Sequence, residues 1–211
     1  MFRRYSMANI ANTLTATEAA CVTGVPLKQV HRIIDAGLLF DGVQVRTGAR
    51  VISGRALVGL RLAHLTADTL TLDARRRIIR RVLDEPKTAT FQEDAVTVAV
   101  APVADDIRDG LESLDHAKAV VSIDPAVMSG APCFVGTRIA VHDLAEMVAN
   151  GDTVDAVAAA YPSVSPDQIQ LAIVYAAAYP RRGRPSAKPA WRNSPALRSK
   201  TLRLGDLPQT A

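Results

Sequence analysis

The stretch TATEAACVTGVPLKQVHRIIDAGLL, residues 15–39, limits the possible folds of this chain more narrowly than any other. Thr15 and Glu18 have the spacing of a capping box, in which the Thr hydroxyl accepts a backbone N–H and the Glu side chain reaches back to the N-cap residue. Gly24 can adopt the positive φ that ends a helix, and Pro26 suits the first turn of the next helix because its missing N–H has no partner there. The sequence therefore predicts two short helices joined by a tight turn.

The second of these helices has an apolar side and a polar side. Val30 and Ile33, together with Val25 in the turn, recur at the spacing that covers a core shared by the two helices. The polar side carries residues that can reach base edges or phosphates when a helix lies in a DNA major groove; they are Lys28, Gln29, His31 and Arg32. A plain helical hairpin explains the same pattern, because helix pairs with a Gly turn are common.

The next segment, VQVRTGARVIS at residues 43–53, contains two short β runs around a turn with glycine. Together with GVPLKQVHRIIDAGLL, it makes residues 13–66 resemble the winged helix-turn-helix domains of the MerR-like and excisionase type, in which the second helix is the recognition helix. The resemblance departs at His31, where such proteins often have Arg. It implies that Arg46 and Arg50 rest on the DNA backbone, where contacts position a protein without reading the base sequence.

Two further helices are predicted before residue 86. Ser53 precedes GRALVGLRLAHLT as an N-cap, and Thr71 precedes LDARRRIIRRVLDE in the same way. The second of these helices has an apolar stripe that can pair with another subunit, formed by Leu72, Ile79, Val82 and Leu83. Its arginines fit two interpretations equally well, a phosphate-contacting face and a basic face exposed to solvent; they are Arg75, Arg76, Arg77, Arg80 and Arg81.

Charge divides the chain into three segments. Residues 1–90 carry 14 basic and 7 acidic side chains, residues 91–180 carry 3 and 13, and residues 181–211 carry 8 and 1. A basic segment is typical of nucleic-acid binding and an acidic one is not, so we predict a DNA-binding domain, an acidic dimerisation domain and a basic tail. Because aromatic residues make up only 4% of the chain, the cores must consist of Ala, Val, Leu and Ile, which favours helices. The predicted fold is mostly α with short β elements.

The acidic segment is predicted to begin with a strand, a helix and another strand. AVTVAVAP and KAVVSIDP have the β-branched content of strands, and Ile107, Leu111 and Leu114 repeat at helical spacing between them. Carboxylates fill the rest of this helix: Asp105, Asp106, Asp109, Glu112 and Asp115. We interpret them as the polar side of an amphipathic helix rather than as a divalent-metal site, because nothing makes them converge.

The rest of the acidic segment carries the most specific motif in the chain. Its marks are Asp124-Pro125, Gly130, Pro132, Gly136-Thr137-Arg138, Val141, Gly151, Tyr161-Pro162 and an Ala-rich closing helix. They make residues 121–180 resemble a small bacterial domain of uncharacterised function found in antitoxins of toxin–antitoxin pairs. The same residues predict a small β unit followed by three helices, the last of them capped by Ser165. The Ala-rich helices allow close packing, so we expect a homodimer through this domain.

The sequence predicts no enzyme, no cofactor and no metal site. Gly136-Thr137-Arg138 can clamp an anion, but no nucleophile lies beside a base, and His142 has no obvious orienting partner except Asp143, so a structural role is favoured for the triplet. Cys21 and Cys133 lack partners at metal-ligand spacing. The sequence has no apolar run long enough for a membrane span or a secretory signal, so we expect a cytoplasmic protein with no membrane partner.

A run of charged residues such as the basic tail, residues 181–211, is usually a solvated segment, but two functional interpretations compete with that one. RRGRP resembles the core of an AT-hook, in which Arg182 and Arg184 enter a narrow A·T-rich minor groove. Alternatively, the tail neutralises the carboxylate cluster of a toxin, anchored by Trp191 in an apolar groove. We favour toxin binding because an AT-hook does not explain the Trp and Leu residues downstream; the residues assigned to it are Arg182, Arg184, Trp191, Arg192 and Arg198.

These resemblances together imply a VapB-type antitoxin. Such a protein neutralises a PIN-domain ribonuclease toxin and represses its own operon by binding operator double-stranded DNA. The alternative is a transcriptional or chromosome-associated regulator with an AT-hook-like tail and no toxin partner.

Overall fold

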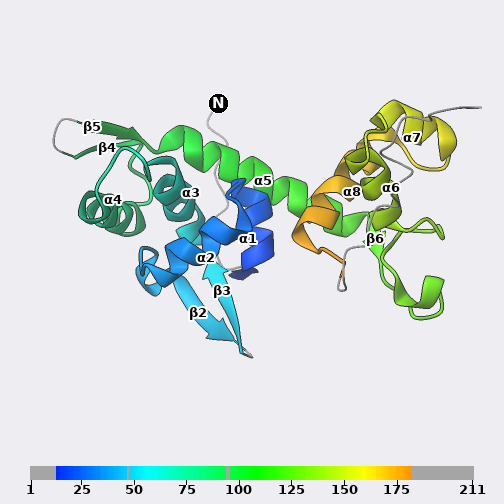
Figure 1. Ribbon diagram of the computed structural model, residues 1–211, viewed down its shortest axis with the longest axis horizontal. Helices are drawn as coiled ribbons and strands as arrows, with labels where there is room; N and C mark the ends of the chain where they lie inside the picture. The colour runs from blue at the N-terminus through cyan, green and yellow to red at the C-terminus, as the bar shows by residue number, and fades with distance from the viewer. Residues whose placement is uncertain (1–12, 47, 94–95, 182–211) are drawn as a thin grey trace, which may run out of the picture. The chain divides into compact units, whose positions relative to one another are not determined.

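The structure, a computed structural model, describes residues 13–46, 48–93 and 96–181 (Figure 1). It is mostly helical with short antiparallel strands, as the sequence predicts. The helices are α1 (Ala16–Thr23), α2 (Leu27–Asp35), α3 (Leu57–Leu65), α4 (Leu72–Asp84), α5 (Ala101–Ala119), α6 (Val141–Ala149), α7 (Val154–Ala160) and α8 (Pro166–Ala178). The strands are β1 (Thr13–Thr15), β2 (Val43–Arg46), β3 (Ala49–Ser53), β4 (Thr90–Glu93), β5 (Val96–Ala99), β6 (Val121–Ser122) and β7 (Cys133–Phe134).

The two predicted N-terminal helices, α1 and α2, are confirmed with their end signals. The Thr15 hydroxyl accepts the backbone N–H of Glu18 at 3.2 Å, and the Glu18 carboxylate accepts that of Thr15 at 2.8 Å. Gly24 ends α1 with a φ of 63°. After α2, Gly37 has a φ of 66° and the N–H of Leu38 donates to the carbonyl of Ile33 at 3.3 Å, which is the pattern of a Schellman motif.

A three-stranded antiparallel sheet with the strand order β1-β3-β2 lies beside these helices. The predicted hairpin is present as β2 and β3, with Val45 opposite Arg50, and Figure 1 shows it extending away from the helices. Strand β1 was not predicted; it pairs Thr13 with Ser53 and Leu14 with Ile52. A segment of three residues has too little alternation to be recognised as a strand, and its pairing depends on residues about 40 positions away.

One predicted helix cap is wrong. Ser53 does not cap the next helix, because the chain first forms a short 3₁₀ helix, η3 (Gly54–Ala56), and no N–H donates to the Ser53 hydroxyl. That hydroxyl is buried without a hydrogen-bond partner among the described residues. The cap at Thr71 is confirmed, since its hydroxyl accepts the N–H of Ala74 at 3.3 Å.

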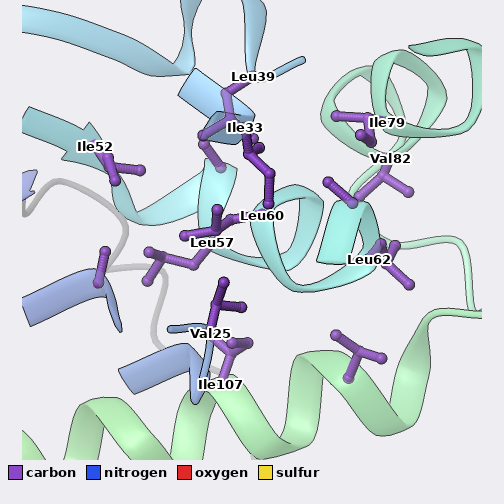
Figure 2. Close-up of a cluster of buried hydrophobic side chains, with 14 of the residues drawn as sticks. Val25, Ile33, Leu39, Ile52, Leu57, Leu60, Leu62, Ile79, Val82 and Ile107 are labelled. Carbon is purple, nitrogen blue, oxygen red and sulfur yellow. The ribbon is translucent and has the colours of Figure 1, made fainter. Parts of the chain in front are cut away.

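The first hydrophobic core is formed mainly by side chains of helices α1 to α5 and of strands β1, β3, β4 and β5. Figure 2 shows Val25, Ile33, Ile52 and other apolar side chains pointing toward one another around Leu57 and Leu60. Most of the predicted stripe on α4 faces this core: Ile79 and Val82 are buried and Leu83 packs partly against them, so these residues are not available to pair with another subunit. The core also continues past residue 90; its members there are Phe91, Val98, Val100, Val103, Ile107, Leu114 and Ala178.

The second core contains the predicted small β unit and its three helices. Strands β6 and β7 pair Val121 with Phe134, and α6, α7 and α8 surround the buried Phe134. The last helix has the predicted N-cap, because the hydroxyl of Ser165 accepts the N–H of Gln168 at 3.2 Å. This core includes Ala117 of α5, so α5 contributes to both cores.

Helix α5 approaches α1 very closely. At Gly110, a Cβ atom would lie 2.6 Å from the carbonyl oxygen of Val22, so only glycine permits this distance between the two helices. The described residues from Thr13 to Arg181 belong to one compact unit, which therefore includes the described parts of the predicted basic and acidic domains. No described helix is long and apolar enough to cross a membrane.

Candidate nucleic-acid interface

The exposed side of α2 brings together most of the predicted DNA-binding residues. Lys28, His31, Arg32 and Asp35 are exposed, and their spacing of three and four residues places them on one face of the helix. Val30 and Ile33 are buried on the opposite face. Gln29 is only partly exposed and lies between the two faces, so it is the least accessible of the predicted residues.

Three basic residues of this surface have no partner among the residues that the structure describes. In the part of the chain that the structure describes, the side chains of Lys28, Arg32 and Arg46 make neither a hydrogen bond nor an ion pair, and all three residues are exposed. Arg50 differs, because its guanidinium donates to the carboxylate of Asp35 at the end of α2. This ion pair joins the hairpin to α2 and compensates the acidic charge on the exposed face.

The arginines of α4 are engaged within the protein. Arg75 donates to the carbonyl of Ala63 on α3, and Arg76 donates to the carbonyl of Ala36 after α2 at 3.3 Å. A basic group at a helix C-terminus satisfies a free carbonyl and opposes the negative end of the helix dipole.

The remaining arginines of α4 contact segments that precede and follow this helix in the sequence. Arg77 pairs with Glu93 of β4, whose side chain is only 10% exposed. Arg80 lies over the ring of Phe40 at 4.3 Å from its centroid, and Arg81 donates to the carbonyl of Gln92 at 3.0 Å. Beside the two interpretations of this basic helix, the geometry therefore favours a third role, in which the arginines hold neighbouring segments together.

The largely buried carboxylate of Glu18 joins α1 to the end of α8. Besides capping α1, Glu18 accepts the phenol hydroxyl of Tyr179 and lies 3.7 Å from the ammonium group of Lys118 on α5. The Glu18 side chain is only 12% exposed. A depression of about 260 Å³ adjoins it, lined by Thr13, Leu14, Glu18, Leu111, Leu114, Asp115 and Lys118.

The protonation of this cluster follows from its contacts. Burial acts to raise the pKa of Glu18, but the hydrogen bonds from Tyr179 and Thr15 and the charge of Lys118 outweigh it and hold the pKa below its usual 4.5. Burial and the bond to the carboxylate raise the pKa of Tyr179. Burial, and then the charge of Glu18, raise the pKa of the Cys21 thiol, so at neutral pH this thiol is protonated.

The Gly136-Thr137-Arg138 triplet forms a tight turn between β7 and α6. Gly136 has a φ of 76°, and the Thr137 hydroxyl donates to the carbonyl of Phe134 at 3.0 Å while accepting the N–H of Ile139 at 3.1 Å. Thr137 therefore holds the turn together. Arg138 is exposed, and its side chain makes no hydrogen bond or ion pair with another described residue.

The expectation that His142 has no partner beyond Asp143 is wrong. Its Nε2 atom lies 2.7 Å from the carbonyl oxygen of Tyr179, and its ring makes a T-shaped contact with the ring of Tyr175. The partner lies 37 residues away, so the sequence around His142 could not reveal it.

The remaining predictions concern a metal site, the carboxylates of α5 and the basic tail. Among the described residues, no three His, Cys, Asp or Glu side chains lie close enough to hold a metal ion. On α5, Asp105 and Asp109 pair with Arg108, and Asp115 lies 3.8 Å from Lys118. The proposed toxin-binding residues Arg182, Arg184, Trp191, Arg192 and Arg198 lie outside the described residues.

Comparison with known proteins assigns the C-terminal domain to a family. Residues 121–176 match the family described as "Protein of unknown function (DUF433)", a small domain found in antitoxin-like proteins. The chain as a whole is 32% identical over 192 residues to the uncharacterized protein y4eO of Sinorhizobium fredii (strain NBRC 101917 / NGR234), covering 84% of this chain and 86% of y4eO. The chain belongs to the same protein family as y4eO.

A solved structure is also similar. The crystal structure of Rv2018 from Mycobacterium tuberculosis aligns with 81% of this chain and 99% of its own length, with a TM-score of 0.31 and 16% sequence identity. A likeness of this size supports no conclusion about fold or function.

Proposed function

We propose that this protein is a DNA-binding antitoxin that represses its own operon. In this proposal, α1, α2 and the β2–β3 hairpin act as a winged helix-turn-helix on operator double-stranded DNA. The observation that carries it is the set of exposed cations on α2 and the hairpin that have no partner among the described residues, Lys28, Arg32 and Arg46. Cations without protein partners are available to neutralise phosphates and release the counterions of DNA.

The proposed roles differ along the surface. Helix α2 enters the major groove, where Lys28 and Arg32 contact base edges or phosphates and His31 lies between them on the same face. Arg46 contacts the DNA backbone from the hairpin. Arg50 positions the hairpin through Asp35, and Gln29 contributes least because it is half-buried.

The antitoxin half of the proposal rests on the C-terminal domain. That domain is of a type found in antitoxin-like proteins, and its helices are rich in alanine. We propose that it dimerises in the cytoplasm and that the tail after residue 181 inhibits a PIN-domain ribonuclease toxin through Arg192, Arg198 and Trp191. A dimer presents two tails, which raises the apparent affinity for a paired toxin.

A direct test of DNA binding uses the full-length chain and a labelled duplex from the region upstream of its own gene. We expect binding that is tighter than to a scrambled duplex of the same composition and that weakens steeply with salt. Arg32→Ala should lower the affinity for the specific duplex about tenfold or more. Equal binding of both duplexes by the wild type would reduce the proposal to non-specific association, and no binding at low salt would refute it.

The alternative is a DNA-binding regulator without a toxin partner, whose RRGRP segment enters the minor groove. The two functions separate when the chain is expressed together with the product of the adjacent gene. A chain that lacks residues 186–211 but keeps RRGRP should fail to relieve toxicity if the tail inhibits a toxin. Full relief by the truncated chain removes the tail from the inhibitory mechanism.

A further inference from the structure

The end of α8 is held at one residue by contacts to two distant elements. The Tyr179 hydroxyl donates to Glu18 on α1, and the Tyr179 carbonyl oxygen lies 2.7 Å from His142 on α6. Two residues later, Arg181 donates to Asp143 and lies 3.7 Å from Glu146, both on α6. The last described residues of the chain are therefore fixed to α6 and, through Tyr179, to α1.

Both carboxylate oxygens of Glu18 already have partners, so Glu18 cannot follow a movement of Tyr179 without losing a contact. One carboxylate oxygen, Oε2, caps α1 through the N–H and the hydroxyl of Thr15, at 2.8 and 2.9 Å. The other oxygen, Oε1, accepts the phenol and faces Lys118. If Tyr179 moves away, a largely buried carboxylate loses its closest donor, which is unfavourable.

Helix α1 in turn supports the candidate DNA-binding helix. It packs against α2, α5 and α8, and the Val22 carbonyl lies against Gly110 of α5 with no room for a side chain between them. A shift of α1 therefore cannot be absorbed on the α5 side, because packed helices deform in discrete steps rather than continuously. Because α1 also packs against α2, we expect a shift of α1 to change the position of α2.

We propose that the Tyr179–Glu18 hydrogen bond couples the C-terminal end of α8 to DNA binding by α2. An interaction that keeps Arg181 bound to α6, or that separates the two, changes the affinity of the α2 surface for DNA. By linkage, DNA binding changes the equilibrium between bound and separated Arg181 by the same factor. The inference rests on the proposed DNA-binding function and adds a means of regulating it. Glu18 and Tyr179 are positioning residues in this scheme, since neither lies on the exposed face of α2.

A double-mutant cycle on the full-length chain tests this coupling. Arg181→Ala releases the end of α8 from α6, and Tyr179→Phe removes only the hydroxyl that reaches Glu18. The matched control is Arg138→Ala, which removes the same charge from an exposed arginine of the same domain that pairs with no other described residue. The affinity of each variant for the upstream duplex is measured at one salt concentration.

We expect Arg181→Ala to weaken DNA binding about fivefold more than Arg138→Ala does, which is a typical size for coupling between sites. In the Tyr179→Phe background, replacing Arg181 should have no further effect beyond that of the control. Such non-additivity distinguishes coupling from two independent losses of stability. Thermal unfolding of each variant establishes that it is folded at the temperature of the assay.

The outcomes separate the coupling from the function on which it rests. If the wild type binds no DNA, the proposed function itself fails. If the wild type binds but the effects of Arg181→Ala and Tyr179→Phe are additive, or Arg181→Ala matches its control, the coupling is refuted while DNA binding stands. Hydrogen exchange provides a second measurement: Tyr179→Phe should speed the exchange of the α1 amides without affecting those of α6.

Discussion

Helix α4 and the surface made by α2 with the β2–β3 hairpin lie in the same basic half of the chain, yet their cations behave differently. The arginines of α4 donate to backbone carbonyls, pair with Glu93 or lie on the ring of Phe40. Lys28, Arg32 and Arg46 have no such contacts among the described residues. The difference teaches that the number of basic residues does not by itself distinguish a candidate nucleic-acid surface from cations that hold the protein together.

The largest effect is expected from removing equal charge from the two regions. The triple variant Lys28→Ala, Arg32→Ala, Arg46→Ala should bind DNA on the order of a hundredfold or more weakly than the wild type, since a single base-contacting arginine contributes about 1 to 3 kcal/mol. The slope of log affinity against log salt should fall by about 0.9 for each phosphate that the variant no longer neutralises. Fluorescence anisotropy with a labelled duplex measures both quantities.

The charge-matched control is Arg76→Ala, Arg80→Ala, Arg81→Ala on α4. We expect it to change DNA affinity by less than about threefold, because these arginines are engaged by Ala36, Phe40 and Gln92 within the protein. If this variant binds DNA as weakly as the first, α4 also contacts DNA and the distinction between partnered and free cations fails.

The next effect concerns the ion pair that fixes α4 to β4. Arg77→Ala leaves the carboxylate of Glu93 buried without this donor, so the free energy of unfolding should fall by about 1 to 3 kcal/mol. Replacing both residues, as in Arg77→Met with Glu93→Leu, should recover most of that decrease because no buried charge remains. Urea denaturation measures both variants. A stable Arg77→Ala variant would show that this arginine does not hold β4 in place.

A smaller effect separates the two possible roles of Arg50. Both members of the Arg50–Asp35 pair are about half exposed, so breaking it should cost only about 0.2 to 1 kcal/mol of stability. If Arg50 only positions the hairpin, Arg50→Ala and Asp35→Ala should weaken DNA binding to a similar extent. If Arg50 contacts phosphate, Asp35→Ala should instead tighten binding, because it frees the guanidinium. Binding assays on the two variants decide between these roles.

The features predicted correctly from the sequence depend on local contacts. The capping box at Thr15, the N-cap at Ser165, the positive φ of Gly24 and the β2–β3 pairing each involve residues a few positions apart. Ser53 shows where such reasoning fails. It precedes a helical pattern, but its pairing with Thr13 and the 3₁₀ helix that follows place its hydroxyl where no helix N–H can donate to it.

The features that were missed depend on contacts between distant segments. Tyr179 reaches Glu18 across 161 positions, and the same Tyr179 supplies the partner of His142. The sequence left two interpretations open for the arginines of α4 because their partners include the carbonyls of Ala63, Ala36 and Gln92. A backbone carbonyl is present at every residue, so no residue pattern can mark it as a partner.

The smallest expected effect is a pH dependence that arises from the partnered carboxylate of Glu18. Its pKa in the folded state lies below 4.5, the value expected in the unfolded chain, because Tyr179, Thr15 and Lys118 stabilise the charged form. A group with a lowered pKa contributes stability above its unfolded value and loses that contribution as the pH falls through its folded value. The wild type should therefore lose stability below about pH 4.5 more steeply than Glu18→Gln, whose amide keeps the capping pattern but does not titrate. Denaturation curves between neutral pH and pH 3 provide the comparison.

The control for this pH dependence uses the cations of the α2 surface. Lys28, Arg32 and Arg46 have no folded-state partners among the described residues, so alanine variants at these positions should give acid curves parallel to that of the wild type. Parallel curves for Glu18→Gln as well would mean that the charge of Glu18 does not contribute to the stability of the folded state.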